Sequence, residues 1–219
     1  MSGKTLIWLL ATLLLATAPP ADAQQPKKVP RIGYLGGTAS NAAFNLKPFR
    51  ERLHELGYVE GQNVTIEIRH HEGKVARLPD LAIELVRLKC DVIVTNGTDA
   101  AEAAKNTIKT IPVVMGWSAD AVRLGIIADL ARPGGNITGL TDVGAEINGK
   151  RLELLKEVVA KLSRVGFLWS SSSAVDIELK ETEPVAQSLR VEIQSLEVKR
   201  PEDFEKAFQA ATKMALRRL

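Results

Sequence analysis

Short apolar segments alternate with amphipathic segments along nearly the whole chain from residue 29 onward, and this alternation constrains the fold more than any other feature. The short apolar segments are typical of buried strands, whereas the segments between them carry leucines at helical spacing. Strands that alternate with helices build βαβ units around a mainly parallel sheet that helices cover on both faces. The sequence therefore predicts an α/β fold, in which ligands bind beyond the carboxyl ends of the strands.

The pattern places each strand and helix. We expect strands at 32–35, 64–68, 91–94, 111–115, 137–140, 165–169 and 191–198. We expect helices at 46–56, 78–88, 99–109, 121–130 and 147–162, another that ends near 189, and a last one that begins at 201. Pro184 should kink or split the helix that ends near 189, because proline lacks the amide hydrogen that a helix needs.

The segment from Leu130 to Thr141 divides the chain into two parts. Pro133 cannot continue a helix, Gly134-Gly135 permits a tight reversal, and a short strand follows. We therefore expect a first Rossmann-like lobe at 24–145 and part of a second at 146–219. The second part has only two predicted strands, which is marginal for an independent sheet. Either the second lobe is incomplete, because the chain is a fragment or the product of a truncated gene, or its strands complete the first sheet.

Residues 1–23 have the features of a secretory signal peptide. Lys4 precedes a leucine-rich apolar stretch at 6–18, and Ala21-Asp22-Ala23 has the small-x-small form of a cleavage site. A transmembrane anchor is the alternative, but the stretch is shorter than the roughly 20 residues that a spanning helix needs. We expect export to the periplasm, which is compatible with a chain whose single cysteine, Cys90, cannot form an internal disulfide.

Composition and residue spacing argue against several classes of function. A formal net charge of +3 without clustered Lys and Arg argues against a nucleic-acid partner. His70 and His71 are neighbours on a predicted strand end, so they should point to opposite faces, and no acid accompanies them at metal-ligand spacing. The three histidines also do not combine with a hydroxyl and an acid into a hydrolase site. We expect no metal, no cofactor and no catalytic residue.

Small, polar and turn-forming residues follow four of the predicted strands, and the opposite strand ends show no such pattern. They are Gly36, Gly37, Thr38, Thr95, Asn96, Gly97, Thr98, Trp117, Ser118, Asp120, Thr141 and Asp142. Because parallel strands place their carboxyl ends along one edge of the sheet, we expect these residues to meet there and to bind a ligand.

These residues have a binding interpretation and a structural one. The helix that begins near Thr98 could bind a carboxylate through its free N–H groups, or Thr98 or Asp99 could simply cap it. Asp120 and Asp142 could bind an ammonium group, or they could be helix caps or solvated acids. Trp117 could stack on a flat ligand group, or it could be a core or rim aromatic. The binding interpretations together describe a site for a zwitterion.

Several longer motifs resemble one protein family. They are Gly57-Tyr58-Val59-Glu60-Gly61-Gln62-Asn63-Val64, Leu85-Val86-Arg87-Leu88 followed by 91–95, and the segments 131–140 and 149–156. Together they resemble the ABC transporter substrate-binding proteins of the tryptophan/aromatic amino acid type over nearly the whole mature chain. The resemblance implies a type I periplasmic-binding-protein fold, in which two Rossmann-like lobes close about a hinge on a small solute. It also implies delivery of the solute to an inner-membrane permease with its ATPase, and no enzymatic activity.

The chain departs from the family pattern in three places. One is the loop after the third strand, which resembles the family's Thr-Ser-Gly-Thr-Pro with Asn96 and Asp99 substituted. The family chain continues beyond the helix that contains Phe204 and Phe208 and completes the second lobe, so an incomplete second lobe is expected here. The loop after the fourth strand typically reads Gly-Asp-Pro-Val in the family and reads Ala119-Asp120-Ala121-Val122 here. We expect the solute-binding component of an ABC importer for a small amino-acid-like solute. The alternatives are an extracytoplasmic sensing module that presents a solute to a membrane receptor, and a truncated remnant that binds nothing.

Overall fold

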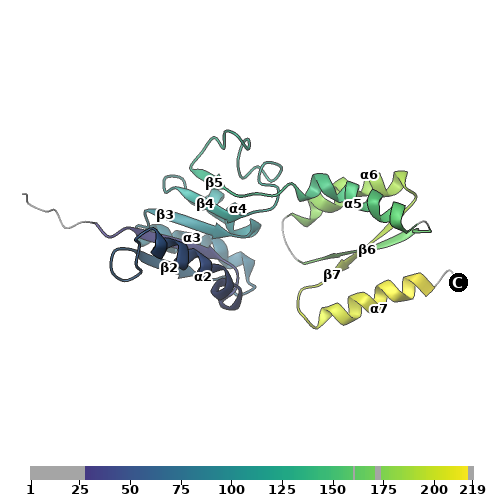
Figure 1. The fold of residues 1–219 in the computed structure, drawn as a ribbon, viewed down its shortest axis with the longest axis horizontal. Coiled ribbons are helices and arrows are strands. Elements are labelled where there is room, and N and C mark those ends of the chain that lie inside the picture. Colours follow the sequence, from purple (N-terminus) through teal and green to yellow (C-terminus); the bar gives the residue numbers. More distant parts are fainter. Residues whose placement is uncertain (1–27, 160, 171–173, 217–219) are drawn as a thin grey trace, which may run out of the picture.

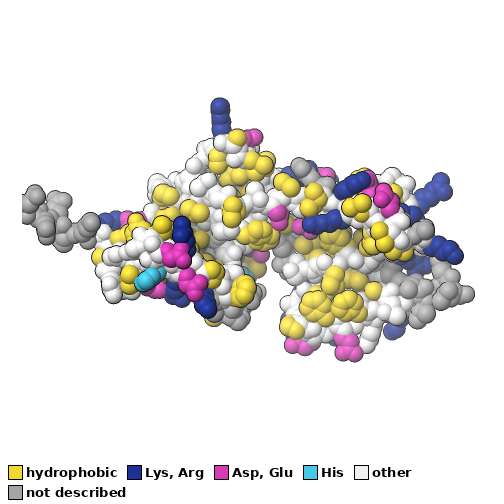
Figure 2. All heavy atoms as spheres, in the orientation of Figure 1, with side chains coloured by type: hydrophobic (Ala, Val, Ile, Leu, Met, Phe, Trp, Pro, Cys, Tyr) yellow, Lys and Arg dark blue, Asp and Glu magenta, His cyan; other side chains and the backbone are white. Residues whose placement is uncertain are grey.

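The computed structural model describes residues 28–159, 161–170 and 174–216 of the chain. It has the expected α/β architecture, with two groups of strands and helices that residues 140–143 connect (Figure 1). The space-filling view shows an open cleft between the two groups on one side of this connection (Figure 2). The expected signal peptide at 1–23 lies outside the described residues, and none of the described helices is long and apolar enough to cross a membrane.

The first group, which we call the first lobe, contains a parallel sheet of five strands in the order β2-β1-β3-β4-β5. Its strands are β1 (Arg31–Gly36), β2 (Thr65–Arg69), β3 (Val92–Asn96), β4 (Val113–Trp117) and β5 (Ile137–Gly139). All the strands expected for this lobe are confirmed, with small shifts of their ends. Parallel pairing places all their carboxyl ends along one edge, and the chain leaves β5 at this edge for the second group.

Helices cover both faces of the first sheet. They are α2 (Ala39–Glu55) on one face, and α3 (Leu78–Arg87) and α4 (Thr98–Thr107) on the other, with a short 3-10 turn, η1 (Val75–Arg77), before α3. The larger core lies beneath α3 and α4, where Leu85, Ile93 and Ala104 are fully buried. A smaller core lies beneath α2, around Tyr34 and Leu46. The leucine spacing that predicted α3 thus marks the face that it buries.

The second group, the second lobe, has a sheet of its own. It contains β6 (Arg164–Trp169) and β7 (Glu192–Glu197), which pair in parallel, and the helices α5 (Gly144–Val158), α6 (Val175–Ser188) and α7 (Asp203–Leu216). α5 and α6 pack together on one face around Leu152 and Ala186, and α7 packs on the other around Leu196 and Ala207 (Figure 1). The alternative that these strands complete the first sheet is therefore wrong.

The two lobes start from the same sequence motif. β1 begins with Arg31-Ile32-Gly33-Tyr34-Leu35, and β6 begins with Arg164-Val165-Gly166-Phe167-Leu168. Each strand pairs in parallel with the next strand of its lobe, and its arginine lies opposite the first residue of that strand, Thr65 in β2 or Glu192 in β7. This repeat allows the two lobes to be compared position by position.

One predicted helix is absent. Residues 121–130 form a series of turns, although Ile126 and Ile127 are buried in the main core. Gly125 has a φ of +64°, a left-handed conformation that ends a helix after its first turn. The backbone N–H groups of Ile126 and Ile127 then both donate to the carbonyl of Ala121, at 2.7 and 3.1 Å. These bonds fold the apolar residues inward without a regular helix.

Two helices differ from their predicted form at proline. α2 begins at Ala39, well before the leucine stripe that predicted it, so that Pro48 lies inside the helix. α6 runs through Pro184 as one element, so this proline does not split it. The packing of α5 against α6 around Leu152 and Ala186 stabilises the helix despite the hydrogen bond that Pro184 cannot donate.

Candidate functional site

The carboxyl ends of the parallel strands form the edge of the first sheet from which the chain crosses to the second lobe. The site residues predicted from the sequence lie along this edge, at strand ends, in loops or, for Thr98, at the first residue of α4. The structure divides them into residues that line a hollow, residues buried beside it, and residues that build the connection between the lobes. Thr38, between Gly37 and the start of α2, adjoins the first set.

The hollow has a volume of about 560 Å³ and lies beyond the ends of β1, β3 and β4. Its lining consists of Gly37, Phe44, Asn45, His71, Asn96, Gly97, Thr98, Asp99, Ala100 and Trp117. The residues of this lining that the sequence had predicted are Gly37, Asn96, Gly97, Thr98 and Trp117. The volume is within the range of small-molecule binding sites, which combine apolar walls with a few polar groups.

The amino end of α4 contributes the polar part of this lining. Gly97 precedes the helix with a φ of +103°, which glycine adopts without strain, and it has no side chain with which to cap the helix. The hydroxyl of Thr98 accepts a hydrogen bond from the backbone N–H of Ala119 at 2.9 Å. The side chain of Thr98 therefore stabilises the loop after β4 and does not cap α4. The N–H groups of the first turn of α4 place partial positive charge at the hollow. The acid of Asp99 in the same turn adds a negative charge to the lining.

Two exposed aromatic side chains border the same hollow. Trp117, at the end of β4, is 47% exposed, and Phe44, on α2, is 83% exposed. They give the hollow apolar, flat surfaces near the polar end of α4. A ligand that combines a flat apolar group with a carboxylate would match both parts of the lining.

The sequence reasoning missed five residues of this lining, two of which, Asp99 and Ala100, directly follow the predicted Thr98 in α4. Phe44 and Asn45 belong to the first half of α2, ahead of the expected helix start, and no periodic signal marked them. His71 follows the end of β2. The prediction of polar groups at strand ends covered four other strands, and the same rule applied to β2 would have found it.

The two neighbouring histidines lie just beyond the end of β2 and have different surroundings. Nδ1 of His70 lies 3.2 Å from the carbonyl oxygen of Gly36, and its ring packs edge-on against Tyr34. Burial lowers the pKa of His71, and the charge of Asp99 opposes this shift, so the imidazole is neutral at pH 7. In the part of the chain that the structure describes, there is no group of three or more His, Cys, Asp or Glu side chains that could hold a metal ion.

Gly36, Thr95 and Ser118 lie outside the lining of the hollow. Thr95 and Ser118 are fully buried, and the backbone of Ser118 donates to the carbonyl of Leu140 and accepts from the N–H of Asp142, each at 3.1 Å. A Cβ atom on Gly36 would lie 2.5 Å from the carbonyl oxygen of Asn96, so only glycine fits between β1 and β3 here. These contacts favour the structural interpretation for Gly36 and Ser118, whereas the buried hydroxyl of Thr95 has no hydrogen-bond partner among the described residues.

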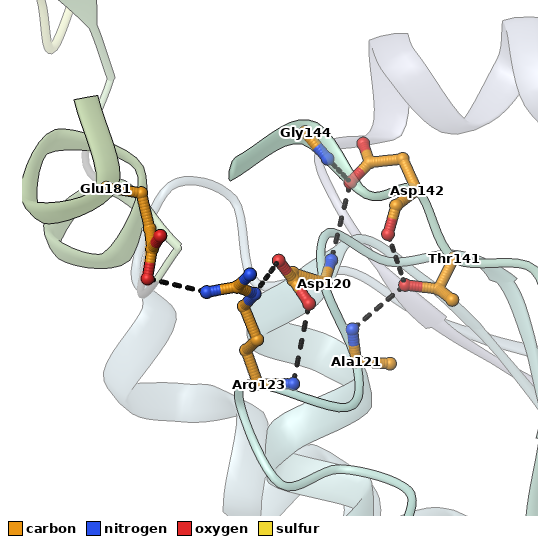
Figure 3. Close-up of polar contacts among 7 residues, drawn as sticks. All are labelled: Asp120, Ala121, Arg123, Thr141, Asp142, Gly144 and Glu181. Carbon is orange, nitrogen blue, oxygen red and sulfur yellow. Dashed lines mark hydrogen bonds and ion pairs between the residues drawn. The ribbon is translucent and has the colours of Figure 1, made fainter. Parts of the chain in front are cut away.

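Thr141 and Asp142 belong to a polar network at the connection between the lobes (Figure 3). The hydroxyl of Thr141 accepts a hydrogen bond from the N–H of Ala121 at 2.9 Å. One carboxylate oxygen of Asp142 accepts from the N–H of Gly144 at 3.2 Å and from the N–H of Asp120 at 3.4 Å. Asp142 thus holds the start of α5 against the loop after β4.

The carboxylate of Asp120 is also engaged within the protein. Its Oδ2 lies 3.2 Å from Nε of Arg123, and its Oδ1 accepts from the backbone N–H of the same arginine at 3.4 Å (Figure 3). Neither Asp120 nor Asp142 is part of the lining of the hollow. Their contacts favour the structural interpretation over an ammonium-binding one.

Comparison with known proteins was consistent with this architecture. The family model for ABC transporter substrate binding proteins matches residues 42–215. A tyrosine-binding protein of Clostridioides difficile is 32% identical over 126 residues, which cover 58% of this chain and 36% of that protein. The chain thus spans little more than a third of this curated relative.

Solved structures show the same fold. A conserved domain protein from Vibrio cholerae aligns with a TM-score of 0.72 at 24% identity, over 85% of this chain and 63% of that chain. An ABC domain in complex with L-Trp from Streptococcus pneumonia aligns with a TM-score of 0.69 at the same identity and coverage. The fold is that of the type I periplasmic binding proteins. Because the family model covers most of its length, the chain belongs to the family of ABC transporter substrate binding proteins.

Proposed function

We propose that this chain is the periplasmic solute-binding component of an ABC importer, and that it binds a small aromatic amino acid at the edge of the first lobe. The observation that carries the proposal is the hollow in which the amino end of α4 lies near Trp117 and Phe44. Membership of the family supports the import role. Among similar proteins, one is a tyrosine-binding protein and one structure contains L-Trp.

In this proposal the solute carboxylate accepts hydrogen bonds from the first N–H groups of α4. These groups are already oriented and their partial charge complements an anion. The aromatic ring of the solute lies against Trp117 and Phe44, where stacking and burial of apolar surface add to affinity. The other polar side chains of the lining are those of Asn45, Asn96, neutral His71 and the acid Asp99.

Capture is proposed to occur by closure of the second lobe over the hollow. The cleft between the lobes is open in this structure (Figure 2). The lobes would correspond to 24–145 and 146–219, with residues 140–143 as the hinge, and closure would bury the solute between them. An inner-membrane permease with its ATPase would then receive the solute from the closed form.

A thermal-shift screen of amino acids and their decarboxylated analogues tests the proposal. Ligand at about 100 times its Kd stabilises a protein by about 2.7 kcal/mol. We therefore expect L-tryptophan or L-tyrosine to raise the unfolding midpoint by roughly 10 °C for the lobe that binds it. Tryptamine and tyramine, which keep the ring and lack the carboxylate, should shift the midpoint little.

The analogues separate the site from the general function. Equal shifts with tryptamine and tryptophan would exclude α4 as the carboxylate site and leave solute binding intact. No shift with any amino acid would contradict the proposed solute class, and would favour a remnant that binds nothing. Conversion of a solute to a product by the purified chain would show an enzyme instead.

A further inference from the structure

The lobes are linked by an ion pair as well as by the chain itself. Nη1 of Arg123, in the loop after β4, lies 2.5 Å from Oε1 of Glu181 on α6 (Figure 3). Arg123 belongs to the first lobe and Glu181 to the second. Within the described residues this pair therefore bridges the two lobes next to the connecting segment 140–143.

Arg123 is held in place by the first lobe. Its Nε lies 3.2 Å from Oδ2 of Asp120, and the two side chains are 33% and 11% exposed. Asp120 has a φ of +33°, a left-handed conformation that is costly for a residue with a side chain. The backbone N–H groups of Asp120 and Ala121 donate to Asp142 and Thr141, so the hinge segment itself fixes this conformation. A change in the hinge would therefore move the guanidinium that holds Glu181.

The second lobe presents a second acid to the hinge one turn away from Glu181. A Cβ atom on Gly144 would lie 3.7 Å from Oε1 of Glu178, which places this carboxylate beside the start of α5. Burial, and next the negative charge of Asp142, raise the pKa of Glu178. Among the described residues, α6 therefore has an attractive contact with the first lobe at Arg123 and faces a repulsive charge at Asp142 of the connecting segment.

We propose that Arg123 is a positioning residue of the hinge, whose guanidinium, anchored by Asp120, ties Glu181 to the first lobe and sets the angle between the lobes. The ion pair offsets the repulsion between Glu178 and Asp142. The ion pair thereby holds α6, and with it the second lobe, in the orientation from which closure begins. This inference rests on the proposed function only for the importance of closure, because the angle itself can be measured without a solute.

The effect should be modest, because solvent reaches both side chains of the pair. Glu181 is 43% exposed, so the ion pair is partly screened. Loss of such a pair should change the population of the observed orientation by about two- to fivefold. High salt should act in the same direction on the unmodified pair.

Distances between two spin labels, one in each lobe, test the inference when they are measured by pulsed electron–electron double resonance. The labels are attached to cysteines introduced at two exposed sites, Asn106 on α4 and Gln187 on α6. The native Cys90 is buried and is replaced by alanine in the labelled parent. The variants are Glu181→Gln, which removes the charge, and Arg123→Lys, which keeps a charge without the fork that contacts both acids. Glu183→Gln removes an exposed acid from the same helix and serves as the matched control.

We expect Glu181→Gln to broaden the distribution of distances and to lower the population of the parent distance by about two- to fivefold. Arg123→Lys should give an intermediate distribution, and Glu183→Gln should match the parent. Raising the salt concentration to about 1 M should broaden the parent distribution and leave Glu181→Gln unchanged. Unfolding midpoints should agree among all variants, which separates a change of angle from a loss of stability.

Identical distributions for the parent and Glu181→Gln would overturn the inference, as would equal broadening by Glu183→Gln. The salt titration on the parent is an independent test if a variant fails to fold, and an unchanged distribution at high salt would likewise overturn the inference. Because these measurements contain no solute, they can fail while the screen of amino acids succeeds, and the reverse also holds.

Discussion

The first and second lobes begin alike and end differently. Each opens with an Arg-x-Gly-x-Leu strand that pairs in parallel with the next strand of its lobe. In the first lobe β1 has a partner on both sides, and one large core joins α3, α4 and three further strands. In the second lobe, within the described residues, β6 pairs with β7 alone, and the buried apolar residues form two small clusters.

This difference shows what a shared motif does and does not determine. The motif fixes the strand, its register and the faces of its side chains. The burial that stabilises the strand comes from the neighbours that the sheet adds around it. Phe204 and Phe208, both on α7, stack on each other with ring centroids 6.3 Å apart. Both side chains are exposed, so part of the apolar surface of the second lobe is uncovered. Figure 2 shows hydrophobic side chains at the surface of the second lobe.

The largest expected difference between the lobes is in hydrogen exchange. The amides of β3 lie in the middle of a five-stranded sheet, and those of β6 in a pair of strands with one partner each. We expect protection factors in β3 to exceed those in β6 by about 100-fold or more, because the second lobe opens without unfolding the first. Exchange measured by NMR, under conditions where the lobes reclose faster than their open forms exchange, gives these values. Equal protection in the two strands would mean that the lobes unfold as one unit, and would refute the comparison.

The glycine shared by the two motifs offers a smaller and more local test. A Cβ atom on Gly33 would lie 3.0 to 3.2 Å from three side chains of the packed core, those of Ile93, Cys90 and Leu85. A Cβ atom on Gly166 would meet mainly the end of the flexible Leu196 side chain, at 2.8 Å. We expect Gly33→Ala to lower the free energy of unfolding of its lobe by about 1–3 kcal/mol, and Gly166→Ala to cost its lobe less than about 1 kcal/mol.

Urea unfolding followed through the indoles of Trp117 and Trp169 separates the two lobes in this test, because each lobe contains one of them. A larger loss for Gly166→Ala than for Gly33→Ala would show that the second lobe is packed as tightly as the first. Gly135→Ala is the control, since a Cβ atom there would contact nothing within 4 Å.

The smallest expected effect is a pH dependence at the hinge. The pKa of Glu178 is raised above its ordinary value of 4.5 in the folded chain, first by burial and then by Asp142. The folded state therefore binds this proton more tightly than the unfolded state. The second lobe should lose stability as pH rises from about 4.5 through the raised pKa. Because solvent screens the half-buried group, the loss should stay below about 1 kcal/mol.

Glu178→Gln should remove this slope and make the second lobe more stable at neutral pH, whereas Glu183→Gln should keep it. Urea midpoints of the second lobe between pH 4 and 7 measure both variants. A slope of the opposite sign in the parent would mean that Arg151 and Asn148, which lower the pKa of Glu178, outweigh burial and Asp142.

The strands could be predicted from sequence because each is either a short apolar run or, as in β2 and β7, a mixture of apolar and polar residues at strand spacing, between turn residues. The helix at 121–130 could not be excluded, because its isoleucines and leucines have helical spacing and only the left-handed Gly125 converts them into turns. The start of α2 could not be placed, since its first half carries no apolar stripe. In each case the apolar pattern identified residues that are buried, but it did not predict the backbone conformation or the helix start correctly.

The edge that holds the candidate site was predictable, because parallel strands bring their carboxyl ends together whatever the details of packing. The sequence did not predict which residues along that edge line the hollow and which make structural contacts. Asp120 and Asp142 were equally plausible as ligand groups and as structural acids until Arg123 and Gly144 were found beside them. Phe44 reaches the hollow only because α2 returns over the sheet, which no local pattern shows.

The central claim is that the hollow at the start of α4 binds an aromatic solute through its carboxylate and its ring. Calorimetric titration of L-tryptophan or L-tyrosine into the parent, Trp117→Ala and Leu130→Ala tests it most directly. Trp117 lines the hollow, and Leu130 is an exposed apolar residue outside it. Loss of one stacking surface should weaken binding about tenfold in Trp117→Ala and leave Leu130→Ala unchanged. Equal affinity in all three proteins, or no heat with either amino acid, would contradict the claim.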